Sequence, residues 1–430
     1  MSLRNTDGQY IPSFFSIILE TDDDVEVAVK KNPATFTHEF VHYLQDLILP
    51  YNIRVNLSKI RWFKNISQVA LNKGYLKRPF KEWDSDSDLL KLQYLYTIGS
   101  GKFVDLVTNI GKPNISEEKR CAFDESFTHR QRKFGIYKYN IPIDSQGAIS
   151  TNYDLGARDL LEYIAHKIEN KHFPTAIPVS QFPYESVDVL FEKYGLSDVP
   201  TAIRVCIAEY CLYNDNPIRL MFNQFLENNT IRALILDERT DFQKIYNFLM
   251  HSGFSTTDGI TESLLDKTSR RLEDFKNDLQ FSYLNSPQIV QWVSRVNIYA
   301  KNRLSNTFIF SDMYRMNTSD LQNFIGETIT TIGIPLVMNK KGKWISLPNT
   351  QAPQKGDAQQ FIQFYILERF LFFLDGKTKS CPIRKFCHCN YTVDCNGGHI
   401  FDRKNRVKEN VACPFWKFLD IYKLSNIQYR

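Results

Sequence analysis

The chain has 430 residues, a formal net charge of +5 from 53 basic and 48 acidic side chains, and an apolar fraction of 43%. Its aromatic content of 14% excludes a disordered protein, and its 18 Gly and 17 Pro exclude a collagen-like or linker-like one. The most apolar stretch, 361–374, contains Gln363, Glu368 and Arg369, so it is too polar for a membrane span of about 18 apolar residues. The amino terminus MSLRNTDGQY lacks a signal-peptide pattern. We therefore expect a soluble cytoplasmic protein with no membrane contact and more than one core.

Strand and helix patterns alternate at the start of the chain, and helix patterns dominate after it. Apolar runs or period-two apolar patterns predict strands over 14–19, 25–29, 133–143, 334–338 and 343–347. The first two are expected to form a β-hairpin, and so are the last two. Apolar residues spaced three and four apart predict helices over 33–48, 57–71, 86–96, 153–168 and 358–374, and mostly helix from 200 to 330. The expected fold class is α+β, mainly helical, with a small β-sheet.

The helix expected at 33–48 carries the sequence His38-Glu39-Phe40-Val41-His42, an HExxH motif. Histidines at i and i+4 lie on one helical face, where their nitrogens can hold a single tetrahedral Zn²⁺ at about 2.0 to 2.1 Å. The ion would lower the pKa of a bound water toward about 7, and Glu39 would accept its proton as general base and pass it to a leaving amine. The alternative is an amphipathic helix whose two histidines and glutamate lie on a solvent-exposed face by coincidence.

Residues 37–46, with the sequence THEFVHYLQD, resemble the active-site helix of the zincin metallopeptidases. The resemblance implies that His38 and His42 bind zinc and that Glu39 is the general base. It also implies that a strand edge above the helix holds the peptide substrate, and that a third zinc ligand comes from further along the chain.

The third ligand distinguishes the zincin subfamilies. A metzincin-like chain has a glycine and a histidine three and six residues after the second histidine, where this chain has Gln45 and Ile48. The gluzincin-like pattern instead takes a glutamate from a later helix, and the best candidate is Glu162, beside the apolar face of the helix expected at 153–168. Because 119 residues separate His42 from Glu162, an inserted segment over about 50–150 is expected.

Other assignments at this site remain open. Three further side chains are alternatives for the third ligand: His166, Glu209 and Glu262. Two carboxylates are candidates for orienting a ligand imidazole: Asp46 and Asp159. A peptidase also needs a hydrogen-bond donor for the tetrahedral oxyanion, for which Tyr163 is the catalytic candidate and Tyr153 and Arg158 are alternatives.

Five of the eight cysteines lie in the last fifty residues: Cys381, Cys387, Cys389, Cys395 and Cys413. In a cytoplasmic chain such a cluster indicates metal binding before disulfides. The surrounding segment has little apolar periodicity, so we expect a second, structural Zn²⁺ held by thiolates, with an Fe–S cluster or unliganded buried thiols as alternatives. Basic residues interleaved with aromatics make the same tail either a solvated loop or a nucleic-acid contact.

These features predict three regions. They are a zincin-like metallopeptidase region at 1–185 with the insert at about 50–150, a helical region at 186–330, and a region at 331–430 with the hairpin, the long helix and the Cys-rich zinc-binding tail. The expected function is zinc-dependent hydrolysis of peptide bonds in an intracellular protein substrate. The alternative is a partner- or nucleic-acid-binding protein with a structural zinc tail and a non-catalytic HExxH helix. A metal hydrolase acting on another bond would use the same ligands.

A cytosolic peptidase must be restrained, because uncontrolled proteolysis would harm its host. Narrow specificity, a regulatory protein partner or a trigger would provide that restraint. A regulatory, toxin-like or defence role is therefore the expectation for its biology.

Overall fold

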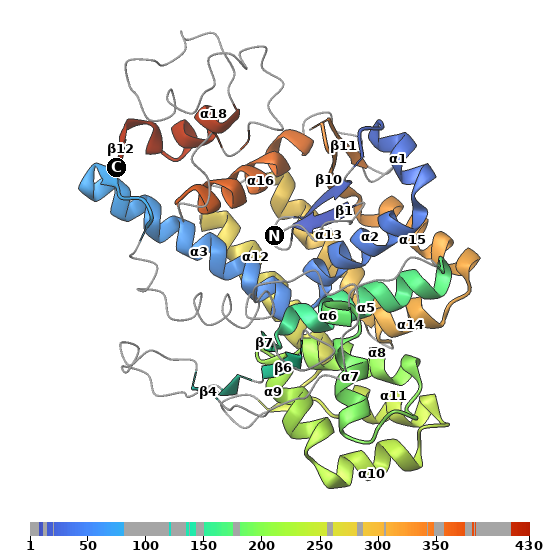
Figure 1. The fold of residues 1–430 in the computed structure, drawn as a ribbon. Helices are drawn as coiled ribbons and strands as arrows, with labels where there is room; N and C mark the ends of the chain where they lie inside the picture. Colours follow the sequence, from blue (N-terminus) through green and yellow to red (C-terminus); the bar gives the residue numbers. More distant parts are fainter. Residues whose placement is uncertain are drawn as a thin grey trace.

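Helices make up most of the structure (Figure 1). A small β-sheet packs against the helix Pro33–Ile48 near the start of the chain. The computed structural model describes residues 8–11, 15–19, 21–80, 120–121, 135–136, 138–142, 150–174, 181–255, 261–281, 287–304, 307–341, 343–347, 357–374, 381, 383 and 414–430. The described α-helices are α1 (Val25–Lys31), α2 (Pro33–Ile48), α3 (Pro50–Lys73), α5 (Ala157–His172), α6 (Gln181–Tyr184), α7 (Ser186–Lys193), α8 (Thr201–Leu212), α9 (Pro217–Leu220), α10 (Asn229–Asp237), α11 (Phe242–His251), α12 (Leu264–Phe281), α13 (Pro287–Leu304), α14 (Ile309–Arg315), α15 (Thr318–Ile332), α16 (Asp357–Leu374) and α18 (Pro414–Ile421). The fold is therefore α+β and mainly helical, as the sequence patterns predict.

The small sheet joins the start of the chain to a segment far along it. Its strands are β1 (Gly8–Ile11), β2 (Ser16–Leu19), β10 (Ile334–Asn339) and β11 (Trp344–Leu347), in the order β1-β2-β10-β11. The two central strands run parallel, with Ile17 opposite Val337, while both outer pairs are antiparallel. The predicted hairpin at 334–347 is confirmed.

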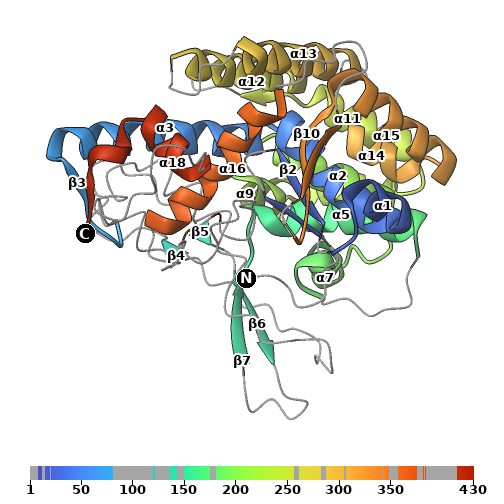
Figure 2. The ribbon, with the colours of Figure 1, turned by 90° about the horizontal axis from the view of Figure 1, so that it is seen from above.

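The remaining described strands form two-stranded pairs. Their bounds are β3 (Tyr75–Leu76) with β12 (Gln428–Tyr429), β4 (Arg120–Cys121) with β5 (Gly135–Ile136), β6 (Lys138–Pro142) with β7 (Ser150–Asp154), and β8 (Phe254–Ser255) with β9 (Thr261–Glu262). Figure 2 shows that the β6–β7 hairpin extends away from the helices, and its second strand leads into α5.

The prediction of a strand at 25–29 is wrong, because that segment forms helix α1. Val25 and Ala28 are buried three residues apart on one helical face, and Val27 is 42% exposed. A strand would have turned all the alternating valines to the same side. The strand that pairs with β2 in a hairpin is instead β1, which precedes it.

Helix α2 has the predicted bounds, Pro33–Ile48, with a proline at its first position where a missing N–H breaks no hydrogen bond. Every residue from Phe36 to Ile48 is buried. The helix is covered by α3, α5 and the strands β1 and β2. The HExxH motif therefore lies on an interior helix rather than on a solvent-exposed face.

Most of the other predicted elements are present with shifted ends. Helix α3 begins at Pro50, earlier than predicted, because this proline also suits a first helical position. Helix α5 begins at Ala157, four residues after the predicted start, because Tyr153 belongs to β7. The helix at 358–374 is confirmed as α16, and the mostly helical character of 200–330 is confirmed as well. The helix predicted at 86–96 lies outside the described residues.

The buried apolar side chains form one continuous cluster that extends from Phe15 to Ile427. Aromatic rings connect distant helices within it: the Phe63 ring on α3 lies 6.0 Å from Phe370 on α16 and 5.5 Å from Phe418 on α18. The first and third regions expected from the sequence thus share both a sheet and a core, and the division into three domains stays a prediction. None of the described helices combines the length and apolarity needed to cross a membrane.

Candidate metal centre

Helices α2 and α5 bring the three sequence-predicted ligands together. Helix α5 packs against α2 (Figure 1). His38 and His42 lie one turn apart on α2, and Glu162 of α5 faces them. The Nε2 atoms of the two histidines are 3.1 Å apart. Oε2 of Glu162 lies 3.3 Å from Nε2 of His38 and 3.2 Å from Nε2 of His42. Within the described part of the chain, these residues form the group of His, Cys, Asp and Glu side chains that could hold a metal ion.

The spacing of the three atoms fits one tetrahedral metal ion. Ligand atoms bonded to Zn²⁺ at about 2.0 to 2.1 Å in a tetrahedron lie about 3.3 Å from one another. The observed separations of 3.1, 3.3 and 3.2 Å are close to this value. The side chains of His38, His42 and Glu162 are 11%, 11% and 15% exposed, so the position between them is largely shielded from water.

The outer nitrogen of each imidazole has its own partner. Nδ1 of His38 lies 2.9 Å from Oε2 of Glu169, and Nδ1 of His42 lies 2.8 Å from Oε1 of Gln45. Nε2 of Gln45 donates to the carbonyl of Leu161 at 3.0 Å, which fixes the amide oxygen toward His42 because a carbonyl can only accept. Nδ1 therefore carries a hydrogen in both rings, and both Nε2 atoms point to the same position.

The charges around this position favour a cation. Burial lowers the pKa of His38, but hydrogen bonds to Glu162 and Glu169 outweigh it and raise the pKa well above its ordinary value. Burial raises the pKa of Glu162, but His42, His38 and Arg158 outweigh it and hold the pKa well below its ordinary value. Without a metal ion these carboxylates therefore favour a proton at this position.

Glu39 is a buried carboxyl next to the proposed ligands. It is 4% exposed, and its Oε2 has no hydrogen-bond partner among the described residues. Burial raises the pKa of Glu39 to about 7, against the opposing effect of His38 and His42. A carboxyl with this pKa and an unpaired oxygen is suited to accept and return a proton near neutral pH.

The alternatives for the third ligand have other positions. His166 is 5% exposed and lies beside the group, with Nδ1 4.0 Å from Oε2 of Glu169. Glu209 accepts a hydrogen bond from the main-chain N–H of Ser311 at 2.8 Å. Glu262 makes a two-point ion pair with Arg270, at 2.8 and 2.9 Å. Of the four candidates for the third ligand, Glu162 has its carboxylate next to both histidines.

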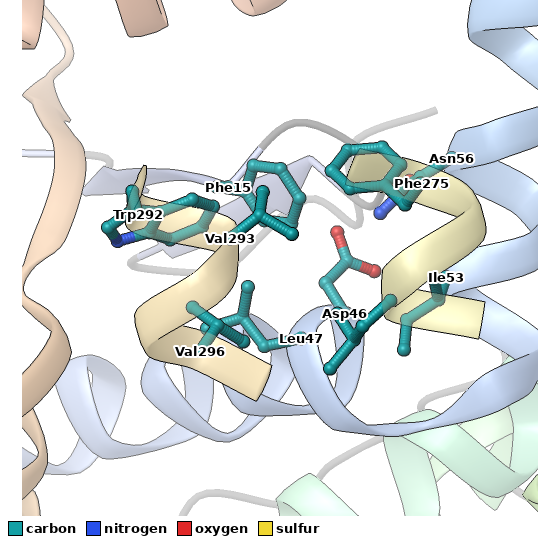
Figure 3. A pocket seen from close by; sticks show the side chains of 10 residues that line it. Phe15, Asp46, Leu47, Ile53, Asn56, Phe275, Trp292, Val293 and Val296 are labelled. Atoms are coloured by element: carbon teal, nitrogen blue, oxygen red, sulfur yellow. The ribbon is translucent and has the colours of Figure 1, made fainter. Parts of the chain in front are cut away.

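The two carboxylates predicted to orient an imidazole each accept a hydrogen bond from another group, and their proposed role stays a prediction. Oδ2 of Asp159 accepts the main-chain N–H of Gly156 at 2.8 Å and caps the start of α5. Oδ1 of Asp46 accepts from Nδ2 of Asn52 at 2.9 Å, and Asp46 borders a cavity of about 10 Å³ among apolar side chains (Figure 3). The side chains of Gln45 and Glu169 lie within hydrogen-bonding distance of the outer imidazole nitrogens.

The structure places Tyr163 away from the ligands. Its hydroxyl donates to Oδ1 of Asp188 at 2.7 Å, and it is fully buried between α5 and α7. A residue one position after Glu162 is rotated about 100° around the helix, which explains why both cannot face the same side. Among the described side chains, Tyr184 lies next to the ligands, with its ring centre 6.1 Å from that of His38. Burial and then Glu162 raise the pKa of the Tyr184 hydroxyl.

Two other side chains were candidates for the oxyanion donor, and the structure describes only one of them, that of Arg158. Nε of Arg158 lies 3.4 Å from Oε1 of Glu162, so this guanidinium adjoins the site. Tyr153 lies on β7, and its side chain is outside the described residues.

The cysteine cluster falls mostly outside the described residues. Cys381 is 4% exposed in the core, whereas Cys387, Cys389, Cys395 and Cys413 are not described. The structural zinc site of the tail and its alternatives therefore stay predictions.

Three residues of the centre were not found from the sequence. Glu169 had a usable signal, since it lies seven positions after Glu162 and thus on the same face of α5. Gln45 had a weaker one, three positions after His42. No sequence signal indicated Tyr184, because its place beside His38 depends on how the chain packs after α5.

Comparisons of the chain with known protein families, with curated proteins and with solved structures give no match. The function is therefore inferred from the geometry of the centre and the chemistry of its side chains.

Proposed function

We propose that the protein is a zinc-dependent metallopeptidase that hydrolyses peptide bonds in a protein substrate. The observation that supports it is the convergence of Nε2 of His38, Nε2 of His42 and Oε2 of Glu162 within 3.1 to 3.3 Å. The buried Glu39, with its unpaired oxygen, adds the general base that hydrolysis requires. Three of these residues, His38, Glu39 and His42, lie in the helix that resembles the zincin active-site helix.

Each side chain has a distinct task in this proposal. A zinc ion held by three protein ligands would polarise the scissile carbonyl and lower the pKa of a water molecule in its fourth position. Glu39, buried beside the ligands with one oxygen unpaired, accepts a proton from the attacking water and delivers it to the leaving amine. The hydroxyl of Tyr184 donates a hydrogen bond to the carbonyl oxygen as negative charge develops on it.

The sheet offers a place for an extended peptide. Strand β1 is at one end of the strand order and packs against α2, the helix that carries His38 and His42. Its one described strand partner is β2, so its other edge can pair with the main chain of a substrate. Such pairing would recognise backbone rather than side chains, and specificity would then depend on pockets or on a protein partner.

Replacement of Glu39 by Gln tests the proposal. The variant keeps the size of the side chain and both histidine ligands but cannot accept a proton. We expect it to retain bound zinc and to lose peptide hydrolysis by several orders of magnitude. Lysate proteins treated with the wild-type chain should gain new amino termini, measured by terminus-selective mass spectrometry, and those treated with the variant should not.

Glu26→Gln is the matched control, because Glu26 lies exposed on the neighbouring helix α1. It should cleave like the wild type. Full activity in Glu39→Gln would reject the role of Glu39. An unchanged set of amino termini with the zinc-loaded wild type would reject peptidase activity and leave a hydrolase of another bond or a binding protein.

A further inference from the structure

Gln45 uses both ends of its amide to connect the two helices of the candidate centre. It lies on α2, three residues after His42, and is fully buried. Its Oε1 accepts from Nδ1 of His42 at 2.8 Å, and its Nε2 donates to the carbonyl of Leu161 on α5 at 3.0 Å. One side chain therefore contacts a ligand of one helix and the main chain of the other.

The main-chain contact adjoins a second ligand, because Leu161 directly precedes Glu162. A carbonyl inside a helix has a second lone pair beyond the one used in the helical hydrogen bond, so it can accept from Gln45 without breaking α5. The position of Glu162 relative to the His42 ring is thereby fixed by two short hydrogen bonds. Tight placement of ligands before the metal arrives reduces the entropy lost on binding.

We propose that Gln45 is a positioning residue that sets the His42 tautomer and fixes α5 relative to α2 at Leu161. This inference rests on one part of the proposed function, namely that the centre binds a metal ion. A glutamine fits the role better than a carboxylate, because only an amide offers an acceptor for His42 and a donor for Leu161 at once. The partner of His38, in contrast, is the carboxylate of Glu169, which accepts a hydrogen bond and adds charge.

Two substitutions separate the two hydrogen bonds. Gln45→Met has a similar length and removes both. Gln45→Glu keeps the acceptor for His42 and removes the donor to Leu161. Gln68→Met is the matched control: Gln68 lies on α3 and its Nε2 bonds Asn72 within the same helix, at 3.1 Å in an exposed position.

Two measurements on the full chain test the proposal. The first is the affinity for Co²⁺, from chelator competition followed by the visible absorption of the bound ion. We expect both Gln45 variants to bind Co²⁺ about 10- to 100-fold more weakly than the wild type, and Gln68→Met to bind it equally well. The second is the ¹⁵N spectrum of labelled histidines in the metal-free protein at alkaline pH. His42 should carry its proton on Nδ1 in the wild type and in Gln45→Glu, and should show mixed tautomers in Gln45→Met.

The two readouts distinguish failure of this inference from failure of the proposed function. Wild-type Co²⁺ affinity in both variants, or an unchanged His42 tautomer in Gln45→Met, would overturn the role of Gln45 while a metal site stands. A wild-type chain that binds no Co²⁺, together with the expected tautomer change, would reject the metal centre and support the positioning of His42. Circular dichroism of each variant establishes that it is folded, and Gln45→Glu serves if Gln45→Met is not.

Discussion

The Nε2 atoms of His38 and His42 face each other at 3.1 Å, while the Nδ1 atom of each ring is bonded on its outer side. Two neutral nitrogen lone pairs at this distance would repel, so the arrangement requires a proton or a metal ion between the rings and the carboxylate of Glu162. In the metal-free protein Glu162 and Glu169 raise the pKa of His38 against the effect of burial, which favours a proton on this imidazole. A metal ion has to displace it.

Metal binding should therefore release a proton, and the affinity should fall as the pH falls. The sign follows from the raised pKa of His38: below that pKa the proton competes with the metal, and above it the competition ends. Calorimetric titration of Zn²⁺ in buffers with different ionisation enthalpies measures the released protons. His251→Ala is the control, because His251 lies exposed at the end of α11. A heat that is independent of the buffer would contradict the expectation.

Tyr184→Phe and Tyr163→Phe should affect different properties. Loss of the Tyr184 hydroxyl should lower kcat about 10²- to 10³-fold with little change in KM or bound zinc, as for the loss of one oxyanion donor. Loss of the Tyr163 hydroxyl removes its hydrogen bond to Asp188 and should lower the free energy of unfolding by about 1 kcal/mol. Steady-state kinetics of both variants measure kcat and KM, and thermal unfolding measures the change in stability. A larger kcat loss in Tyr163→Phe than in Tyr184→Phe would reverse the assignment.

Glu209 should make the stability depend on pH. It is fully buried on α8, and burial raises its pKa from 4.5 to about 8. Because the folded-state pKa lies above the unfolded one, the contribution of this group is present below about pH 4.5 and is lost as the pH rises through about 8. The loss at alkaline pH amounts to about 3 to 5 kcal/mol.

Glu209→Gln should therefore be more stable than the wild type at about pH 9, and should lose that advantage at about pH 5. Thermal unfolding at both pH values measures the difference. The exposed Glu227 provides the control, and Glu227→Gln should follow the wild type at each pH. Identical pH slopes for Glu209→Gln and the wild type would show that Glu209 is not the titrating group.

The number of zinc ions per chain separates the two predicted metal sites. A centre on α2 and α5 together with a structural site in the tail predicts two ions, of which His38→Ala removes one. Cys387→Ser should remove the other and leave peptidase activity in any chain that stays folded. Inductively coupled plasma mass spectrometry of the purified chain gives the count. One ion that survives His38→Ala would favour the binding-protein alternative, in which the HExxH helix holds no metal.

The sequence predicted the parts of the centre that depend on local patterns. The bounds of α2 follow from a proline at its first position and from regular apolar spacing, and both are properties of the segment itself. Glu162 followed from its place beside the apolar face of an amphipathic helix, together with the chemistry that the HExxH motif requires. Packing of α5 on α2 brings it within 3.3 Å of both imidazoles.

What the sequence missed depends on contacts between segments. Tyr163 was chosen for its closeness to Glu162 along the chain, but adjacent helical residues face different directions. Tyr184 reaches His38 because the chain returns after α5, and no local pattern indicates such a return. Similarly, alternating valines fit either a strand or one face of a short helix, and the pairing of β2 with β1 and β10 leaves 25–31 to form α1.

Ser16 of β2 lies opposite Leu336 of β10, 320 positions further along the chain. At a translation rate of about 5 to 20 residues per second, β2 leaves the ribosome roughly 16 to 64 s before β10 is made. During that interval the parallel neighbour strand is missing beside Ile17 and Ile18, which are both buried in the complete sheet. A nascent chain would thus expose an unpaired apolar strand edge, to which chaperones can bind. The helices that carry His42 and Glu162 emerge only 120 positions apart, so the ribosome delivers both long before it delivers the strand that completes the sheet.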